Sequence, residues 1–261
     1  MSIGEQIRNA LQQDTGYRLR VAMGLVPGVS TVHVRGRNPG VDTTERVLWA
    51  PGAVEYGGFL TAPSAVRVKA GGNANDTAAG TGARRVLVTG LDGNLGVATE
   101  ELVLAGASAS SPSSSTFLRL LEAHVTDCGS YTSPYNAGDV SIETTGGTEL
   151  IRMLAGRSQS QVGVYTVPAG HTLYVARLSV AIEGNKVATV RLWRRSDANV
   201  VTAPCTAKRM LHEWPLLATV ADLRGEGWES YPAATDLWFA AYTASGTTAV
   251  SAELDGYCVA D

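Results

Sequence analysis

The stretch from Ala65 to Leu91 constrains the fold most, because a period of two runs through both of its ends. Val66 and Val68 share one face near its start, and Val86 and Val88 share one face near its end. Such alternation is typical of β-strands with one buried face. The connection between them is rich in glycine and asparagine, which favours a turn at the surface. We therefore expect two strands that form a β-hairpin.

Similar alternating segments recur along the chain, and turn residues separate them. Asp92-Gly93-Asn94 predicts a tight reversal of the chain, because an Asp-Gly pair readily accepts positive φ. Gly106–Ser115 has low complexity, so we expect an exposed, mobile loop. Many short strands with few helices predict an all-β fold of antiparallel sandwich or jelly-roll domains. The further strands are expected within Thr31–Arg35, Val97–Leu104, Phe117–Val125, Asp139–Glu143, Thr148–Leu154, Tyr174–Ile182, Ala188–Trp193, Leu237–Tyr242 and Val250–Asp255.

The N-terminal residues combine a helix signal with a strand signal. Ser2 and Glu5 have capping-box spacing, and the apolar residues that follow are spaced by four, which predicts a short helix. Apolar and basic residues then alternate from Tyr17 to Met23, which predicts a strand. The apolar positions of these two elements are Ile3, Ile7, Leu11, Tyr17, Leu19, Val21 and Met23.

Residues 36–63 follow neither a helical nor a strand period and are rich in Gly and Pro. Because Trp49, Tyr56 and Phe59 would be costly to leave in water, we expect an ordered, irregular arm. The arm either wraps over its own domain or reaches across a subunit boundary. The expected organisation is an N-terminal helix, strand and arm (1–64), a first β-sandwich (65–160) and a C-terminal jelly-roll-like sandwich (161–261).

Composition favours some classes of protein over others. Charged residues make up 17% of the 261 residues and the net charge is −3, with no basic stripe of the kind that binds nucleic acid. No apolar run reaches the roughly 20 residues that span a bilayer, and the first residues do not resemble a secretory signal. Three widely spaced cysteines argue against a disulfide framework and favour a reducing cytoplasm.

A search for catalytic and cofactor-binding patterns is negative. Residues 80–85 read GTGARR, which begins like a dinucleotide-binding loop but lacks its last glycine and precedes a strand. His124 and Cys128 have helical ligand spacing in a region that is expected to be a strand and a turn. The five tryptophans could stack on sugars, although packing in a core or an interface is the more common role. We therefore expect no enzyme activity, no cofactor and no metal.

The glycine-rich connection is expected to be a structural turn built from Asn75, Asp76, Thr77, Gly80, Gly82 and Arg84. The Asp76 carboxylate can accept hydrogen bonds from nearby backbone N–H groups in an Asx turn. Gly80 and Gly82 allow positive φ or close backbone approach. Arg84 is the candidate charge partner of Asp76.

Several blocks of sequence resemble a family of structural proteins of tailed-bacteriophage particles. The central block is residues 75–84, NDTAAGTGAR, and the likeness extends over roughly residues 41–182. The other blocks are Val41-Asp42-Thr43, Trp49, Pro51-Gly52, Tyr56, Phe59, Val88-x-Gly90-Leu91-Asp92, Asn136-Ala137-Gly138-Asp139 and Tyr165-Thr166-Val167-Pro168-Ala169-Gly170.

The resemblance implies a virion protein, assembled in the cytoplasm of the bacterial host. The favoured role is a capsid decoration or cement protein, a homotrimer that binds the major capsid protein. The alternative is a tail, fibre or head-fibre component that contacts a host surface glycan, and a virion-borne glycan hydrolase has less support. The candidate residues for capsid or subunit contact are Ile3, Ile7, Leu11, Tyr17, Leu19, Trp49, Tyr56 and Phe59.

Overall fold

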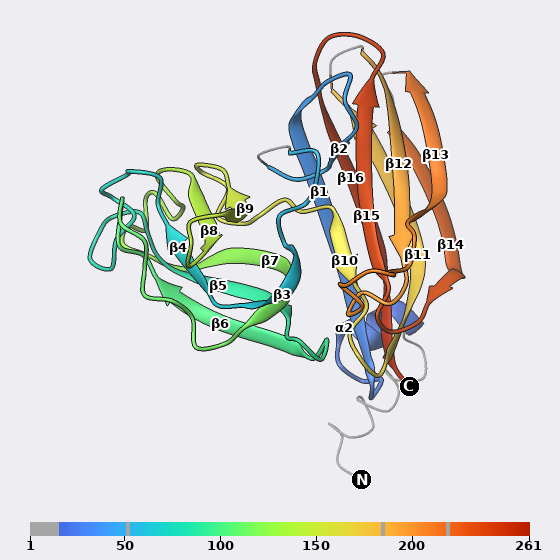
Figure 1. Cartoon of the computed structure of the whole chain (residues 1–261), viewed down its shortest axis with the longest axis horizontal. Coiled ribbons are helices and arrows are strands. Elements are labelled where there is room, and N and C mark those ends of the chain that lie inside the picture. The colour runs from blue at the N-terminus through green and yellow to red at the C-terminus, as the bar shows by residue number, and fades with distance from the viewer. Residues whose placement is uncertain (1–15, 51–52, 184–185, 218–219) are drawn as a thin grey trace, which may run out of the picture.

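The computed structural model describes residues 16–50, 53–183, 186–217 and 220–261, which form two antiparallel β-sandwiches that lie side by side (Figure 1). Nearly all of the regular secondary structure in the described part of the chain is strand, with one short helix, α2 (Tyr17–Ala22). The all-β sandwich prediction is confirmed.

The larger sandwich is built from strands at both ends of the chain. Its first sheet has the order β1 (Val29–Val41), β16 (Thr248–Ala260), β11 (His171–Ile182) and β14 (Val220–Tyr231). Its second sheet has the order β10 (Val164–Thr166), β15 (Asp236–Thr243), β12 (Val187–Arg195) and β13 (Arg209–Leu217), and β2 (Arg46–Val47) also pairs with β15. Val32, Val34 and the alternate residues of β16 fill the core between these sheets, as the period of two predicts.

The smaller sandwich contains the residues between β2 and β10. One sheet has the order β3 (Phe59–Ser64), β7 (Phe117–Cys128), β5 (Ala83–Leu91) and β6 (Val97–Val103). The other consists of β4 (Val66–Lys69), β8 (Val140–Thr144) and β9 (Glu149–Met153). The reversal at Asp92 joins β5 to β6 as expected, and the Asp92 carboxylate accepts hydrogen bonds from the N–H groups of Asn94 and Gly96 at 2.8 and 2.9 Å.

The hairpin prediction for the stretch from Ala65 to Leu91 is wrong, although its strands are where we expect them. Val66, Val68, Val86 and Val88 are all fully buried. However, β4 pairs with β8, whereas β5 pairs with β6 and β7. The connection therefore crosses from one sheet to the other. Alternation identifies the buried face of a strand but not its partner, so it cannot separate these two arrangements.

The serine-rich loop also differs from the prediction, because it is held against the edge of β4. The N–H of Val66 donates to Ser113 Oγ at 2.9 Å, and the N–H of Ser113 donates to the Val66 carbonyl at 2.7 Å. Ser110 makes the same pair of contacts with Val68, at 3.0 and 2.8 Å. Small hydroxyl side chains thus satisfy an edge strand that would otherwise expose its backbone.

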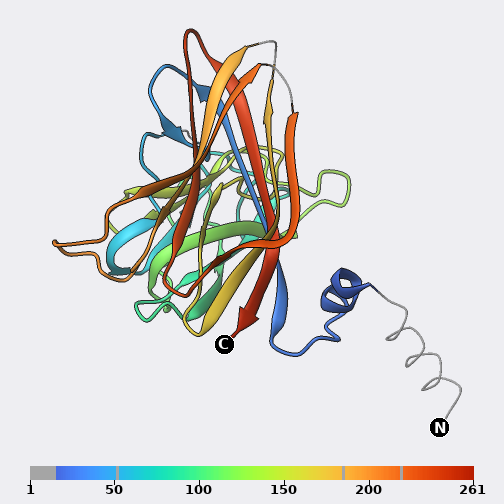
Figure 2. The same cartoon turned by 90° about the vertical axis from the view of Figure 1, so that its right-hand side faces the viewer.

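The N-terminal region is organised differently from the expected separate arm. β1 pairs with β16, so residues within 1–64 supply an edge strand of the C-terminal sandwich. Residues 17–22 are helical and not extended, and Figure 2 shows α2 beside the start of β1. Val21 is buried, whereas Leu19 and Met23 are about half exposed, so the apolar residues do not share the one face that a strand would give them. The helix expected over Ile3, Ile7 and Leu11 lies outside the described residues.

Candidate functional site

Asp76, in the connection between β4 and β5, is fully buried and holds three segments together. Its Oδ1 atom accepts hydrogen bonds from the N–H groups of Ala83 at 2.8 Å and Ala137 at 2.9 Å. Its Oδ2 atom accepts one from the N–H of Gly138 at 2.8 Å. A buried carboxylate with several backbone donors is a strong, directional anchor. The predicted structural role of Asp76 thus involves residues about sixty positions away, and not a local Asx turn.

The glycines of this connection are needed because other atoms occupy the space of a side chain. A Cβ atom added at Gly82 would lie 2.2 Å from Asp76 Oδ1, and one added at Gly80 would lie 2.1 Å from the Asn75 carbonyl oxygen. Backbone hydrogen bonds close the turn, from Gly82 to Asn75 at 2.8 Å and from Gly80 to Thr77 at 3.0 Å. Close approach, and not positive φ, explains these two glycines.

Arg84 is not the hydrogen-bonding partner of Asp76. Its Nε atom donates to the Gly80 carbonyl oxygen at 2.9 Å, so it braces the turn from the other side. Backbone N–H groups satisfy the Asp76 carboxylate instead. Spacing along the sequence suggested an ion pair, but it could not show that a distant loop supplies the donors.

The Asn136–Asp139 block completes this cluster. Asn136 is fully buried, and its Nδ2 group donates to the carbonyls of Gly138 and Leu154 at 2.8 and 3.0 Å. Its Oδ1 atom accepts a hydrogen bond from the N–H of Ser158 at 2.8 Å. Two of the blocks that carry the family resemblance, residues 75–84 and 136–139, therefore meet in one hydrogen-bonded cluster, which we call the Asp76 cluster.

The joint between the sandwiches contains a second buried carboxylate, Asp236 on β15. Arg119 on β7 of the small sandwich reaches it, with Nε 3.0 Å from Oδ1 and Nη2 3.1 Å from Oδ2, and both side chains are fully buried. Thr166, in a third block of the resemblance, donates to Oδ1 at 2.7 Å, and Arg195 donates to Oδ2 at 2.7 Å. Arg119 also donates to the carbonyls of Leu60 and Ala198, which belong to different sandwiches.

Sequence reasoning did not single out Arg119 or Asp236. Arg119 lies in the predicted strand Phe117–Val125, where its neighbours Phe117, Leu118 and Leu120 are buried. A charged residue inside such an apolar run was the available signal. A buried arginine requires a carboxylate or several carbonyl partners, but the strand pattern does not identify them.

Aromatic residues of the expected arm pack within their own chain at this joint. Trp49 and Tyr56 are 2% and 4% exposed, and the Tyr56 hydroxyl donates to the Leu120 carbonyl at 2.7 Å. Phe59 packs edge-on against Tyr56 and against Trp238 of the large sandwich, and the Arg119 guanidinium lies over its ring at 5.2 Å. Of the two interpretations of the arm, the structure favours the segment that wraps over its own domain.

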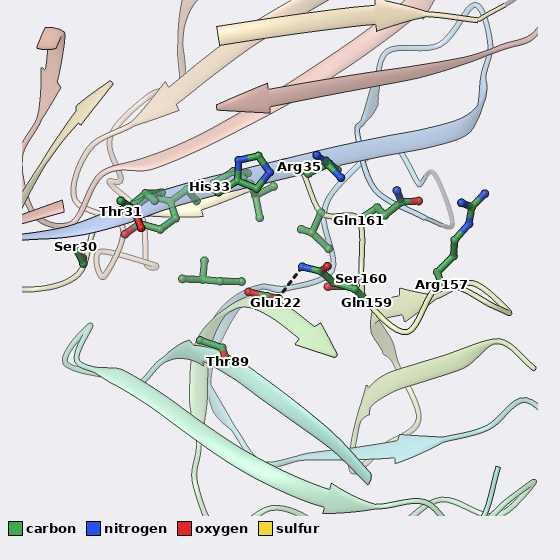
Figure 3. A pocket seen from close by; sticks show the side chains of 16 residues that line it. Ser30, Thr31, His33, Arg35, Thr89, Glu122, Arg157, Gln159, Ser160 and Gln161 are labelled. Carbon is green, nitrogen blue, oxygen red and sulfur yellow. Dashed lines mark hydrogen bonds between the residues drawn. The ribbon is translucent and has the colours of Figure 1, made fainter. Parts of the chain in front are cut away.

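A groove of about 490 Å³ lies between the two sandwiches (Figure 3). The edge of β1 from Ser30 to Arg35 forms one wall, while Glu122 on β7 and the linker 157–165 form the other. Within this second wall, Gln159 Nε2 of the linker donates to Glu122 Oε1 of β7 at 2.9 Å. Polar and apolar side chains from both sandwiches line the groove.

Metal-ligating residue types and two of the cysteines, Cys128 and Cys258, complete the survey of titratable groups in the described residues. No group of three or more His, Cys, Asp or Glu side chains gathers in a geometry for a metal ion among the described residues. Burial raises the pKa of the Cys128 thiol, and burial also raises that of Cys258 although Tyr165 hydrogen-bonds to it. Both thiols therefore stay protonated near neutral pH, where a reactive cysteine would be a thiolate. In the part of the chain that the structure describes, no helix is long and apolar enough to cross a bilayer.

These features define a two-domain, all-β protein in which the turn blocks at 75–84 and 136–139 hold the small sandwich together and Asp236 joins it to the large one. No protein-family model matches the chain, and no curated protein matches it. Solved structures give distant likenesses to capsids. One is infectious bursal disease virus, Gt strain, at 9% identity and a TM-score of 0.24, covering 94% of this chain and 78% of that one. Another is a T=1 particle derived from the same virus, at 9% identity and a TM-score of 0.15, covering 95% and 84%. At these scores, neither likeness bears on function.

Proposed function

We propose that this chain is a non-enzymatic structural protein of a tailed-bacteriophage virion. Its particular role is capsid decoration: a homotrimeric cement protein that binds the major capsid protein and stabilises the head by bridging capsomers. It assembles onto the particle in the cytoplasm of the bacterial host, and it engages neither nucleic acid nor a membrane.

The observation that carries this proposal is the place of the resembling residues in the fold. The blocks at 75–84 and 136–139 meet in the Asp76 cluster, and Thr166 of the block at 165–170 binds Asp236 at the joint. Three of the resembling blocks thus contribute side chains or backbone groups to hydrogen-bonded joints of one structure. The resemblance therefore concerns the residues that hold this fold together, which supports membership of the same class of proteins.

The architecture also suits a protein that bridges its neighbours. The buried contacts of Arg119 and Phe59 fix the small sandwich to the large one, so the chain presents two surfaces at a set separation. Stable interfaces usually bury about 1,200–2,000 Å² in total, and two sandwiches offer room for contacts to more than one capsomer.

Copy number tests the proposal most directly. In quantitative mass spectrometry of purified particles, we expect this chain at a copy number comparable to that of the major capsid protein. A few copies per particle, lost together with the tail, would overturn the decoration role and favour the tail, fibre or head-fibre alternative. In that case antibodies against the chain should block adsorption to the host, and binding to purified host glycans becomes the next measurement.

A further inference from the structure

The outer edge of β1 faces the groove between the two sandwiches. Among the described strands β1 pairs with β16 alone, so its other side is a free sheet edge. Just before β1, the Gly28 carbonyl accepts a hydrogen bond from the N–H of Ala260 at 2.7 Å. Even-numbered residues therefore direct their backbone groups toward β16. The N–H of Arg37 donates to the Gln161 carbonyl at 3.4 Å, so odd-numbered residues direct theirs toward the groove.

Three residues of this edge, Thr31, His33 and Arg35, thus offer their N–H and C=O groups to the groove. The register with β16 is regular from Val29 to Asn38, so the alternation holds through all three. Within the part of the chain that the structure describes, these N–H and C=O groups have no hydrogen-bond partner. All three residues are exposed and line the groove. An unpaired edge of this kind is a template for one more strand.

The opposite wall cannot supply that strand, because its own backbone is already bonded elsewhere. The linker lies along β7, where the N–H of Val125 donates to the Ser158 carbonyl and the N–H of Ser160 donates to the Ala123 carbonyl, each at 2.8 Å. Its contact with β1 is limited to the bond between Arg37 and Gln161. The volume of about 490 Å³ that remains is within the range of ligand-binding clefts, about 300–1,000 Å³.

Apolar side chains line the inner side of the β1 edge. Val32 and Val34 belong to the core of the large sandwich, and Tyr165 packs partly buried against that core. An added strand would turn alternate side chains toward this side of the sheet. The groove is therefore suited to an extended segment with apolar residues at every second position.

The charges of the lining differ along the groove. Figure 3 shows Arg157 toward the end that Arg35 occupies, away from Ser30, with Glu122 nearer the middle. Arg35 is bound to Glu253, whereas Arg157 is exposed and has no ion pair among the described residues. The unneutralised charge at this end is positive. It complements a carboxylate on the bound segment.

We propose that the edge of β1 from Thr31 to Arg35 binds one extended peptide segment of a partner protein, which becomes a fifth strand of the first sheet. Backbone hydrogen bonds to β1 hold the segment, its alternate apolar side chains face the core of the large sandwich, and an acidic side chain at one end binds Arg157. The inference goes beyond the decoration role and does not rest on it, because it concerns the chemistry of the segment and not the identity of the protein that carries it.

Fluorescence anisotropy with the full chain and labelled peptides tests the proposal. The probe is a heptapeptide of alternating threonine and valine that ends in glutamate. We expect it to bind, and we expect the same peptide ending in lysine to bind about fivefold more weakly. A version with N-methylated valines, which cannot donate backbone hydrogen bonds, should not bind. Failure of the glutamate peptide to bind, or equal binding of all three peptides, overturns the proposal.

Variants locate the binding edge. His33→Pro removes one N–H on the open side, which an edge strand tolerates, and should weaken binding of the glutamate peptide about tenfold relative to His33→Ala, which retains that N–H. Arg157→Gln should abolish the preference for the glutamate peptide over the lysine peptide. Arg85→Gln, at an exposed arginine outside the groove, is the control and should keep that preference. Equal binding by the two His33 variants, or a preference that survives Arg157→Gln, overturns the assignment.

Hydrogen exchange gives a readout that needs no variant. In the unaltered chain, saturation with the glutamate peptide should slow exchange of the Thr31, His33 and Arg35 amides. Unchanged exchange at these amides overturns the proposal even if the peptide binds. Light scattering identifies the other occupant: a dimer of the unaltered chain that the glutamate peptide does not dissociate, and that is lost in His33→Pro, would assign the edge to a second copy and overturn the proposed partner.

Discussion

Arg119 and Asp236 form an ion pair between the two sandwiches, with Nε 3.0 Å from Oδ1 and both side chains 0% exposed. Burial of two charges is costly, and here the cost is offset by further hydrogen bonds from Thr166 and Arg195 to Asp236 and from Arg119 to backbone carbonyls. The pair thus fixes which surfaces of the two sandwiches meet.

Removal of Arg119 should leave the Asp236 carboxylate buried with fewer donors. We expect Arg119→Ala to lower the free energy of unfolding by about 3–5 kcal/mol, as measured by urea denaturation. Arg35→Ala provides the control, since the Arg35–Glu253 pair lies on an exposed sheet face and should contribute less than about 1 kcal/mol. Equal effects of the two changes would show that the buried pair has no special role.

Replacement of Asp76 should disorder the connection between the two sheets of the small sandwich. Asp76→Ala leaves the N–H groups of Ala83, Ala137 and Gly138 without their acceptor, and we expect a loss of about 3 kcal/mol or more because these bonds go to a charged group. Asp92→Ala is the comparison, since it removes a carboxylate that accepts two N–H groups in a less buried turn. A loss at Asp76 no larger than that at Asp92 would contradict the anchoring role.

Gly82→Ala tests whether the close approach of Gly82 to the Asp76 carboxylate requires a glycine. The added Cβ atom would lie 2.2 Å from Asp76 Oδ1, so the carboxylate must shift away from its donors. Overpacking of this kind typically costs about 1–3 kcal/mol. Gly40→Ala is the matched control, because its added Cβ atom meets nothing closer than 3.9 Å. Thermal unfolding that responds alike to both changes would argue against a steric requirement.

Glu100 should make the small sandwich sensitive to acid. Burial opposes its ionisation, but hydrogen bonds from Ser115 and Ser114 outweigh that effect and lower its pKa. A lowered folded-state pKa contributes stability that is present above the ordinary value of about 4.3 and is lost as the pH falls through the folded-state pKa. We expect the urea unfolding midpoint of Glu100→Gln to fall less steeply than that of the unaltered chain as the pH is lowered through the acid range. An unchanged acid dependence would show that Glu100 is not among the groups responsible.

Leu19 is the most exposed of the candidate capsid contacts whose side chains the structure describes. It is 56% exposed on α2, next to Met23 at 52%. If this apolar pair docks on the major capsid protein, Leu19→Asp should weaken binding to heads that lack this chain at least tenfold, or about 1.4 kcal/mol, without a change in melting temperature. Val54→Asp, at a 47% exposed valine away from α2, serves as the control. Undiminished binding of the Leu19 variant would place the capsid contact elsewhere.

The sequence predicted which residues face the cores far better than it predicted which strands pair. Alternation located the buried valines of β4 and β5 and the inward face of β16, because burial on one side of a strand imposes a period of two. Pairing depends on residues far away in the chain, so β4 was assigned to β5 in place of β8. The strand expected at Tyr17 failed for a related reason, since four alternating residues fit a short helix with one buried side chain equally well.

The sequence predicted which residues form the turn around Asp76, but it did not predict which groups they bind. The glycines and the aspartate at 76 were recognised because Gly and Asp have well-defined roles in turns. Their partners at 137 and 138 are reached only through the tertiary fold, and no local pattern reveals them. Trp49 and Tyr56 illustrate the same limit. Their apolar bulk required burial, but the sequence did not specify whether their own chain or a neighbouring subunit would cover them.

The pairing of β1 with β16 has a consequence for the order in which the protein folds. His33 and Asp255, opposite each other in these strands, are separated by 222 residues. The strands of the small sandwich are all synthesised between them, so this domain can complete its sheets on the ribosome while β1 still waits for its partner. Contacts of such long range close slowly, and β1 leaves an unpaired edge exposed in the meantime. If the small sandwich folds first, its strands are already paired and cannot pair wrongly with β1. β1 then pairs with β16 once β16 has been synthesised.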